Sequence, residues 1–308
     1  MVDEVNVTVF GDLGKPAKEL IERISNAIGI VYYPYNQRRI ARADAEVNEI
    51  KALAQQQISR LNDTDSMEKL IGRTQSRVDF GNIRDQINIE SVLEKTLPLL
   101  NEESNPSQLD DDWMKVFFDR CASISDGEVQ GIWARLLASE AGKVGSYSIR
   151  TLRLLSELSK DEQQKFQEVC QFTWIINGIP HLIISDSNDN IYHEHFYPKL
   201  LILESSGLIK INDVANTFYK VDPSDRNNLT QGIFIRHVDE LFTIRNVEKT
   251  INIGMDIPLG MAFFTPVGKE LLQLVKRESI PDFIEHSLDF WSDFQITGVT
   301  EINVNNFK

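Results

Sequence analysis

The sequence predicts a mainly α fold, in which long N-terminal helices and a central helical module precede a smaller, winged-helix-like α+β C-terminal domain. Apolar residues recur at the three- and four-residue spacing of helix faces over most of the first 170 positions. Ser125 with Glu128 and Ser159 with Glu162 have the spacing of helix-capping boxes. Short alternating runs follow Cys170. We therefore expect a helical assembly region over 1–105, the central module over 106–158 and the C-terminal domain over 159–308.

The N-terminal region begins with an alternating run, Val5, Val7 and Val9, that fits a strand. Pro16 then fits the first turn of a helix, because proline lacks an N–H that would be unpaired there. The helix has one apolar face, formed by Ala17, Leu20, Ile21, Ile24, Ala27 and Ile28. Gly29 and Pro34 should end or kink it.

A second helix is expected from Tyr35 to about Leu61. Its seam alternates steps of three and four residues through Ile40, Ala43, Val47, Ile50, Ala54, Gln57 and Leu61. This is coiled-coil spacing, although it covers only about three heptads. Packing within the chain and self-association both remain open for this helix.

The next stretch, 62–105, is less regular. We expect a helix from near Ser66, interrupted by Gly72 and Gly81, and a linker over 101–108. Asp110 to Asp112 then mark a helix start, where carboxylates interact favourably with the helix dipole. Trp133, in the helix opened by the first capping box, is predicted to anchor the core.

The C-terminal domain shows a strand-like run near His181, a helix that Gly207 ends, and several short alternating runs. A last helix is opened by Pro266 and capped by Thr265. This order of helix, glycine stop, hairpin and closing helix is typical of a winged helix.

Five pieces of the chain carry a family resemblance. They are GDLGKPAKELIERISNAIG near the N-terminus, EVQGIWARLLASE at 128–140, SIRTLRLLSELSKDE at 148–162, SSGLI at 205–209 and FTPVGKELL at 264–272. At these pieces the chain resembles an uncharacterised family of bacterial proteins related to the abortive-infection alpha family of phage-resistance proteins. The resemblance implies a role in defence against phage or a related stress response, and it transfers no catalytic residues.

Candidate partner-binding residues gather before and within the second helix, because tyrosines suit wet interfaces and arginines suit acidic partners. Arg135 is a further candidate, since it lies on a different helix face from Trp133 and can pair with a carboxylate of this chain or of a partner. The full set is Ile30, Tyr32, Tyr33, Tyr35, Arg38, Arg39, Arg42 and Arg135. The amphipathic stretch 13–35 leaves a membrane surface as an alternative partner.

No enzyme or cofactor is expected. The chain lacks a G-x-S-x-G elbow, a phosphate-binding glycine loop and a cysteine with an evident histidine partner. An active site built from carboxylates far apart in the sequence would leave no such motif. His193 and His195 supply too few ligands for a metal, and the helix dipole alone explains Asp110 to Asp112.

Charge and composition make further classes of partner and compartment unexpected. The net charge of -14 repels polyanions, and residues 160–278 carry 12 basic and 16 acidic side chains, so nucleic acid is not an expected partner. Cys121 and Cys170 are far apart, the N-terminus has no secretory pattern, and every apolar run falls short of the roughly 20 residues that span a bilayer. We therefore expect a cytoplasmic, non-enzymatic, defence-associated protein that works through protein contacts and self-assembly. The rivals are a nucleic-acid-binding winged-helix protein and a peripheral membrane effector.

Overall fold

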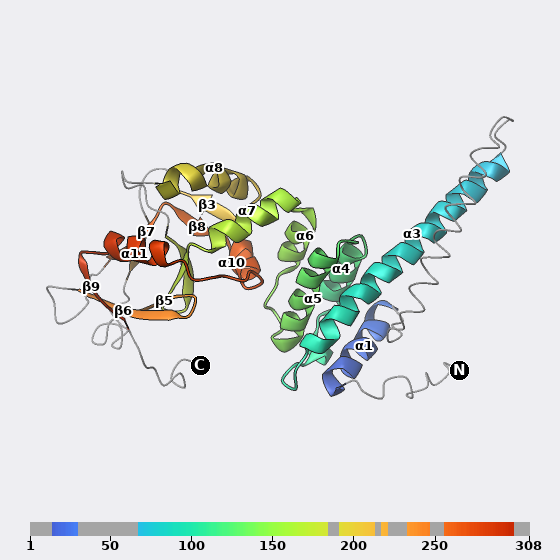
Figure 1. Ribbon diagram of the computed structural model, residues 1–308. Helices are drawn as coiled ribbons and strands as arrows, with labels where there is room; N and C mark the ends of the chain where they lie inside the picture. Colours follow the sequence, from blue (N-terminus) through green and yellow to red (C-terminus); the bar gives the residue numbers. More distant parts are fainter. Residues whose placement is uncertain are drawn as a thin grey trace. The chain divides into compact units, whose positions relative to one another are not determined.

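The computed structural model describes residues 14–29, 67–183, 191–212, 217–220, 233–246 and 256–298 (Figure 1). The chain divides into two compact units, Met1–Ser156 and Glu157–Lys308. Within the described ranges, no helix is long and apolar enough to cross a membrane. The predicted strand near the N-terminus and the predicted helix over 35–61 lie outside the described residues.

The first unit is helical and has an aromatic core. Its helices are α1 (Lys15–Ile28), α3 (Met67–Thr96), α4 (Asp111–Cys121), α5 (Gly127–Gly142) and α6 (Ile149–Glu157), with the short 3-10 helices η2 (Leu97–Leu99) and η3 (Pro106–Gln108). Trp133 is fully buried, as predicted, with its ring centroid 5.2 Å from that of Phe117. Phe117 in turn stacks on Trp113 at 5.3 Å. These rings join α4 to α5.

Helix α1 begins and ends as its sequence predicts. Pro16 lies in the first turn, and Gly29 ends the helix with a φ of 70°. The apolar face packs against α4 and η3, with Ala17, Leu20, Ile21 and Ile24 buried. Arg23 fixes this contact, because its Nη2 atom lies 2.6 Å from the carbonyl oxygen of Leu109 and 2.6 Å from Oδ1 of Asp111.

Aspartates cap the two helices of the central region. The Asp110 carboxylate accepts a hydrogen bond from the Trp113 N–H at 2.9 Å, at the start predicted for α4. The capping box predicted for Ser125 and Glu128 is wrong, because Asp126 is the N-cap of α5. One Asp126 oxygen accepts from the N–H groups of Glu128 and Val129, at 3.0 and 3.2 Å. An ionised carboxylate accepts hydrogen bonds more strongly than the neutral hydroxyl of Ser125 does, so Asp126 caps the helix.

Helix α3 is continuous over 30 residues, so the predicted interruptions at Gly72 and Gly81 are wrong. A single helical glycine costs only about 1 kcal/mol relative to alanine, which the rest of a long helix can offset. The segment predicted as a linker, 101–108, also makes tertiary contacts. Asn105 N–H donates to the Ala141 carbonyl at 2.7 Å, and Pro106 is buried.

The second unit combines sheets with helices. Strands β1 (Thr173–Ile176), β2 (Ile179–Leu182), β5 (Ile233–His237), β6 (Glu240–Asn246) and β9 (Phe294–Gly298) form an antiparallel sheet in the order β2-β1-β5-β6-β9. Two further antiparallel pairs join β3 (Ile209–Ile211) to β8 (Ala262–Phe264) and β4 (Thr217–Lys220) to β7 (Asp256–Gly260). The helices are α7 (Lys160–Cys170), α8 (Ile191–Ser205), α10 (Pro266–Leu272) and α11 (Pro281–Phe290).

The predicted fold class, mainly α with a smaller winged-helix-like domain, is wrong. The molecule is α+β, and its second unit is strand-rich and about as long as the first. Two of the short alternating runs expected in the winged-helix-like domain, IFIRHV and LFTI, fall at β5 and β6, which pair as a hairpin inside the five-stranded sheet. Their outer partners, β1 and β9, lie about 60 and 50 residues away in sequence, where a local pattern carries no pairing information.

The closing helix α10 packs on the end of α8 as a tight unit. Thr265 caps α10, as predicted, by accepting the Gly268 N–H at 3.1 Å, and its hydroxyl donates to the Gly207 carbonyl at 2.7 Å. Gly268 then lies directly against the backbone of Leu208. The pieces SSGLI and FTPVGKELL therefore meet in space.

Candidate protein-contact surface

The two halves of helix α3 differ in burial. Its C-terminal half packs against α5 and α4, with Ile89, Val92, Leu93 and Thr96 buried. Polar bonds fix this packing: Asn88 Nδ2 donates to the Ala122 carbonyl at 2.6 Å, and Lys95 Nζ donates to Gln130 Oε1 at 2.6 Å. This half belongs to the core of the first unit.

The N-terminal half of α3 exposes large apolar side chains. Leu70 is 48% exposed, Ile71 60% and Val78 44%. Figure 1 shows this half of the helix extending past the ends of α4 and α5. Apolar groups left in water cost roughly 25 cal/mol per Å², so three of them along one helix favour a partner that covers them.

The exposed residues continue the side of α3 that is buried farther along. At about 100° per residue, Leu70, Ile71, Thr74, Val78 and Gly81 fall on the same side of the helix as Ile89 and Val92. We call this group of five residues the α3 face. Its five residues are uncharged, and the exposed Arg77 borders them about 20° beyond Leu70. The surface between Leu70 and Gly81 thus resembles one side of a helix–helix contact, with no second helix among the described residues.

The opposite side of α3 has a different environment. Phe80, Ile83 and Ile87 are half-buried, and they lie roughly 155° around the helix from the centre of the α3 face. One neighbouring helix covers only one side of α3. Covering both sides therefore requires two different neighbours.

The sequence-predicted contact residues fall into two groups. Ile30, Tyr32, Tyr33, Tyr35, Arg38, Arg39 and Arg42 lie outside the described residues. Arg135 is exposed on α5, and we find no hydrogen bond or ion pair between its guanidinium and the part of the chain that the structure describes. Arg135 therefore lies on α5 and not on the α3 face.

The described part of the stretch 13–35, for which a membrane surface is an alternative partner, is helix α1. The apolar face of α1 is occupied by the unit's own α4 and η3. Lipid contact through this stretch would then depend on residues 30–35, outside the described ranges.

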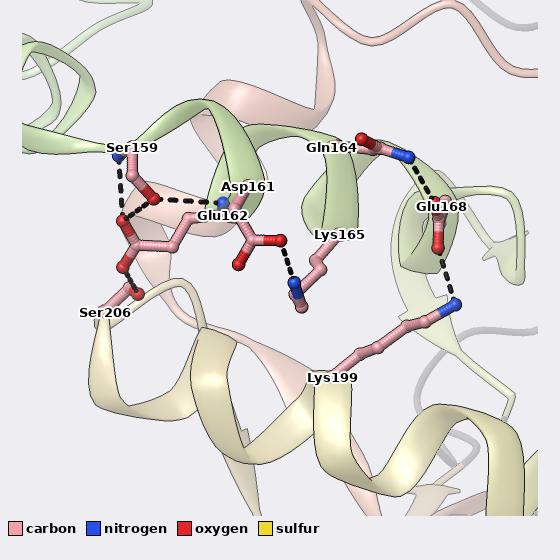
Figure 2. A network of polar contacts seen from close by, with 8 residues as sticks. All are labelled: Ser159, Asp161, Glu162, Gln164, Lys165, Glu168, Lys199 and Ser206. Carbon is pink, nitrogen blue, oxygen red and sulfur yellow. Dashed lines mark hydrogen bonds and ion pairs between the residues drawn. The ribbon is translucent and has the colours of Figure 1, made fainter.

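A polar network joins α7 to α8 in the second unit (Figure 2). Ser159 and Glu162 form the predicted capping box, with the Ser159 N–H donating to Glu162 Oε2 at 2.8 Å and the Glu162 N–H donating to Ser159 Oγ at 3.2 Å. The Ser206 hydroxyl donates to the other Glu162 oxygen, and Lys199 Nζ binds Glu168 at 2.6 Å. The hydrogen bonds from Ser206 and Ser159 lower the pKa of Glu162. Hydrogen-bond donors of the chain thus bind the carboxylates of both Glu162 and Glu168, so the network stabilises the packing of α7 against α8.

The two cysteine thiols have shifted pKa values. Burial raises the pKa values of the Cys121 and Cys170 thiols, so both stay protonated and unreactive at neutral pH. Residues 191–205 are helical, so the strand geometry that would place His193 and His195 on one face is absent. Among the described residues, no group of three or more metal-ligating side chains comes together.

Residues 72–287 match the model of a protein family described as "Protein of unknown function (DUF2806)". The chain belongs to the DUF2806 family. The DUF2806 match begins within the exposed half of α3 and ends within α11, so it includes Thr74, Val78 and Gly81 of the α3 face. No curated protein and no solved structure matches the chain.

Sequence reasoning alone missed the α3 face of this DUF2806 protein. The signal was present as a seven-residue spacing, because Ile71, Val78 and Val92 are separated by multiples of seven. The two glycines and Asp85 within the stretch hid that spacing.

Proposed function

We propose that this DUF2806 protein acts without catalysis, through self-assembly and protein contacts, and that a second copy of the chain covers the α3 face. The observation that carries the proposal is the exposure of Leu70, Ile71 and Val78 on the same side of α3 that is buried farther along.

The character of the α3 face favours a second copy as the occupant. Each chain carries a net charge of -14, so two copies repel each other least where their contact surfaces lack acidic side chains. The α3 face is uncharged from Leu70 to Gly81. In a two-fold antiparallel contact centred on Thr74, Leu70 and Ile71 of each copy would meet Val78 of the other, as an isologous interface requires.

The size of the α3 face indicates that it does not act alone. A stable interface buries about 1,200–2,000 Å² in total, which three half-exposed aliphatic side chains from each copy do not supply. The predicted helix over 35–61 carries a coiled-coil seam and ends five residues before α3 begins. We propose that this helix adds to the same assembly.

The biological role proposed for the assembly is defence against phage. Its support is the resemblance of five pieces of the chain to relatives of the abortive-infection alpha proteins. SSGLI and FTPVGKELL, two of those pieces, form the α8–α10 contact. The test is the plating efficiency of phages on bacteria that express the chain or its V78E variant. We expect fewer plaques with the intact chain and a loss of that protection with V78E.

Light scattering on the full chain tests the assembly itself. We expect a mass above that of one chain for the wild type, and a shift toward the single-chain mass for L70E/V78E, because each glutamate would be buried without a partner. The matched control is L99E/V144E, which alters two aliphatic residues of the same unit with 48% and 41% exposure. A wild type that is a monomer throughout, or an equal effect of both double variants, would contradict self-assembly through α3.

A further inference from the structure

The segment between α10 and α11 is bound at four points to the strand-bearing part of the second unit. Gln171 holds it twice, since its Nε2 donates to the Lys276 carbonyl at 3.2 Å and its Oε1 accepts the Glu278 N–H at 2.8 Å. Arg277 Nη1 donates to the Thr173 carbonyl at 3.2 Å, and the Ser279 hydroxyl donates to Glu240 at 2.6 Å. We call residues 276–279 the clasp.

A buried histidine shares one of these four points. His237, at the end of β5, is fully buried, and its Nδ1 lies 3.1 Å from the Thr173 carbonyl oxygen that also accepts from Arg277. A carbonyl oxygen only accepts, so Nδ1 carries the hydrogen and the neutral ring leaves Nε2 without one. Nε2 is buried and has no hydrogen-bond partner among the described residues.

The surroundings of His237 oppose a positive charge on the ring. Trp174 and Phe283 pack on it, with ring centroids 5.4 and 5.2 Å away. Arg277 of the clasp opposes the charged ring and Glu240 on β6 favours it. Arg236, the preceding residue on β5, acts on Arg277. Burial is the largest influence and lowers the pKa of His237, and Arg277 acts in the same direction, whereas the hydrogen bond to the Thr173 carbonyl raises it.

The turn that joins His237 to Glu240 is strained. Val238 has a φ of 51°, a left-handed conformation that is unfavourable for a β-branched residue. Both ends of this turn contact the clasp region, His237 through the shared Thr173 carbonyl and Glu240 through Ser279. The bonds to the clasp therefore help to hold a conformation that the turn alone disfavours.

We propose that residues 276–279 form an acid-releasable clasp, in which protonation of His237 places two cations on the Thr173 carbonyl and frees the segment that leads into α11. The released histidine reaches water, where Nε2–H finds an acceptor. Release also lets the strained turn at Val238 relax.

Hydrogen exchange on the full chain tests the clasp between pH 7.5 and 5.0, with rates corrected for the intrinsic pH dependence of exchange. The Glu278 amide, which donates to Gln171, is the reporter. Between the ordinary histidine pKa and the lowered pKa of clasped His237, we expect its protection to fall about tenfold per pH unit.

Two variants separate His237 from other titrating groups. H237N keeps an N–H donor for the Thr173 carbonyl and cannot gain charge, so protection should not change with pH. R277Q removes the second cation and brings the pKa of clasped His237 closer to its ordinary value, so the total loss of protection by pH 5.0 should be smaller. This variant tests the proposal if H237N does not fold. Unchanged wild-type protection at pH 5.0, or an acid response retained in H237N, would overturn the proposal.

Discussion

Gly268 is a single residue on which the packing of α10 depends. A Cβ atom built there would lie 2.0 Å from the Leu208 carbonyl oxygen, and that oxygen is backbone with little freedom to move. The close approach brings Thr265 and Gly268 against the end of α8, so the glycine is required by contact and not by its φ angle.

We predict that Gly268→Ala destabilises the second unit by about 1–3 kcal/mol, the usual cost of overpacking a filled site. Urea unfolding measures the change as a lower midpoint. Gly142→Ala is the control, because a Cβ there meets nothing within 4 Å. Equal midpoints for both variants would show that the α8–α10 contact adjusts more freely than its geometry implies.

Residue-scale features were the most predictable from sequence, because a cap depends on neighbours within three positions. Thr265 and the Ser159–Glu162 pair cap their helices as predicted. The capping box predicted for Ser125 was wrong because Asp126, one position later, supplies the stronger acceptor. The clasp could not be predicted, since its bonds join residues about 40 to 107 positions apart.

At the scale of elements, α3 combines a packed half with an exposed half, and Gly72 lies in the exposed half. A Cβ at Gly72 meets nothing within 4 Å, and this residue lies off the α3 face. We predict that Gly72→Ala stabilises the first unit by up to about 1 kcal/mol through helix propensity.

Thermal unfolding should show the gain as a higher midpoint, with the mass from light scattering unchanged. Gly81→Ala offers a comparison, because it has similar open space but lies on the α3 face. A lower midpoint for Gly72→Ala would mean that the helix needs this glycine for a contact outside the described residues.

The helices were more predictable than the sheet for a physical reason. A helix buries a stripe that repeats every three or four residues, so α1, α4, α5 and α7 were visible in the sequence. The five-stranded sheet required β1, which is only four residues long, to find β5 about 60 positions later. The α3 face was missed because Gly72 and Gly81 suggested breaks that the folded helix absorbs.

For the whole molecule, two histidines of the second unit make stability depend on pH. Burial lowers the pKa of His181 from 6.5 to about 4 and also lowers that of His237. The unfolded chain therefore binds protons first as the pH falls. The contribution of His181 to stability is full above about pH 6.5 and is lost as the pH falls toward about 4.

We predict that the thermal midpoint of the second unit falls between pH 7.5 and 5.0, and that H181N/H237N reduces this fall. H286N provides the control, because His286 lies on α11 of the same unit and is only half-buried. The same fall in the double variant and the wild type would assign the pH dependence to carboxylates instead.

Cysteine cross-linking most directly tests the claim that the α3 faces of two chains meet. The native thiols, Cys121 and Cys170, are buried, so an added exposed cysteine reports alone. Thr74→Cys places it at the centre of the proposed two-fold contact, and Val144→Cys places it on an exposed site away from α3. Under mild oxidation at low protein concentration, we predict a disulfide-linked dimer for Thr74→Cys and a monomer for Val144→Cys. A monomer for Thr74→Cys, or equal dimer yields for the two variants, would contradict the account.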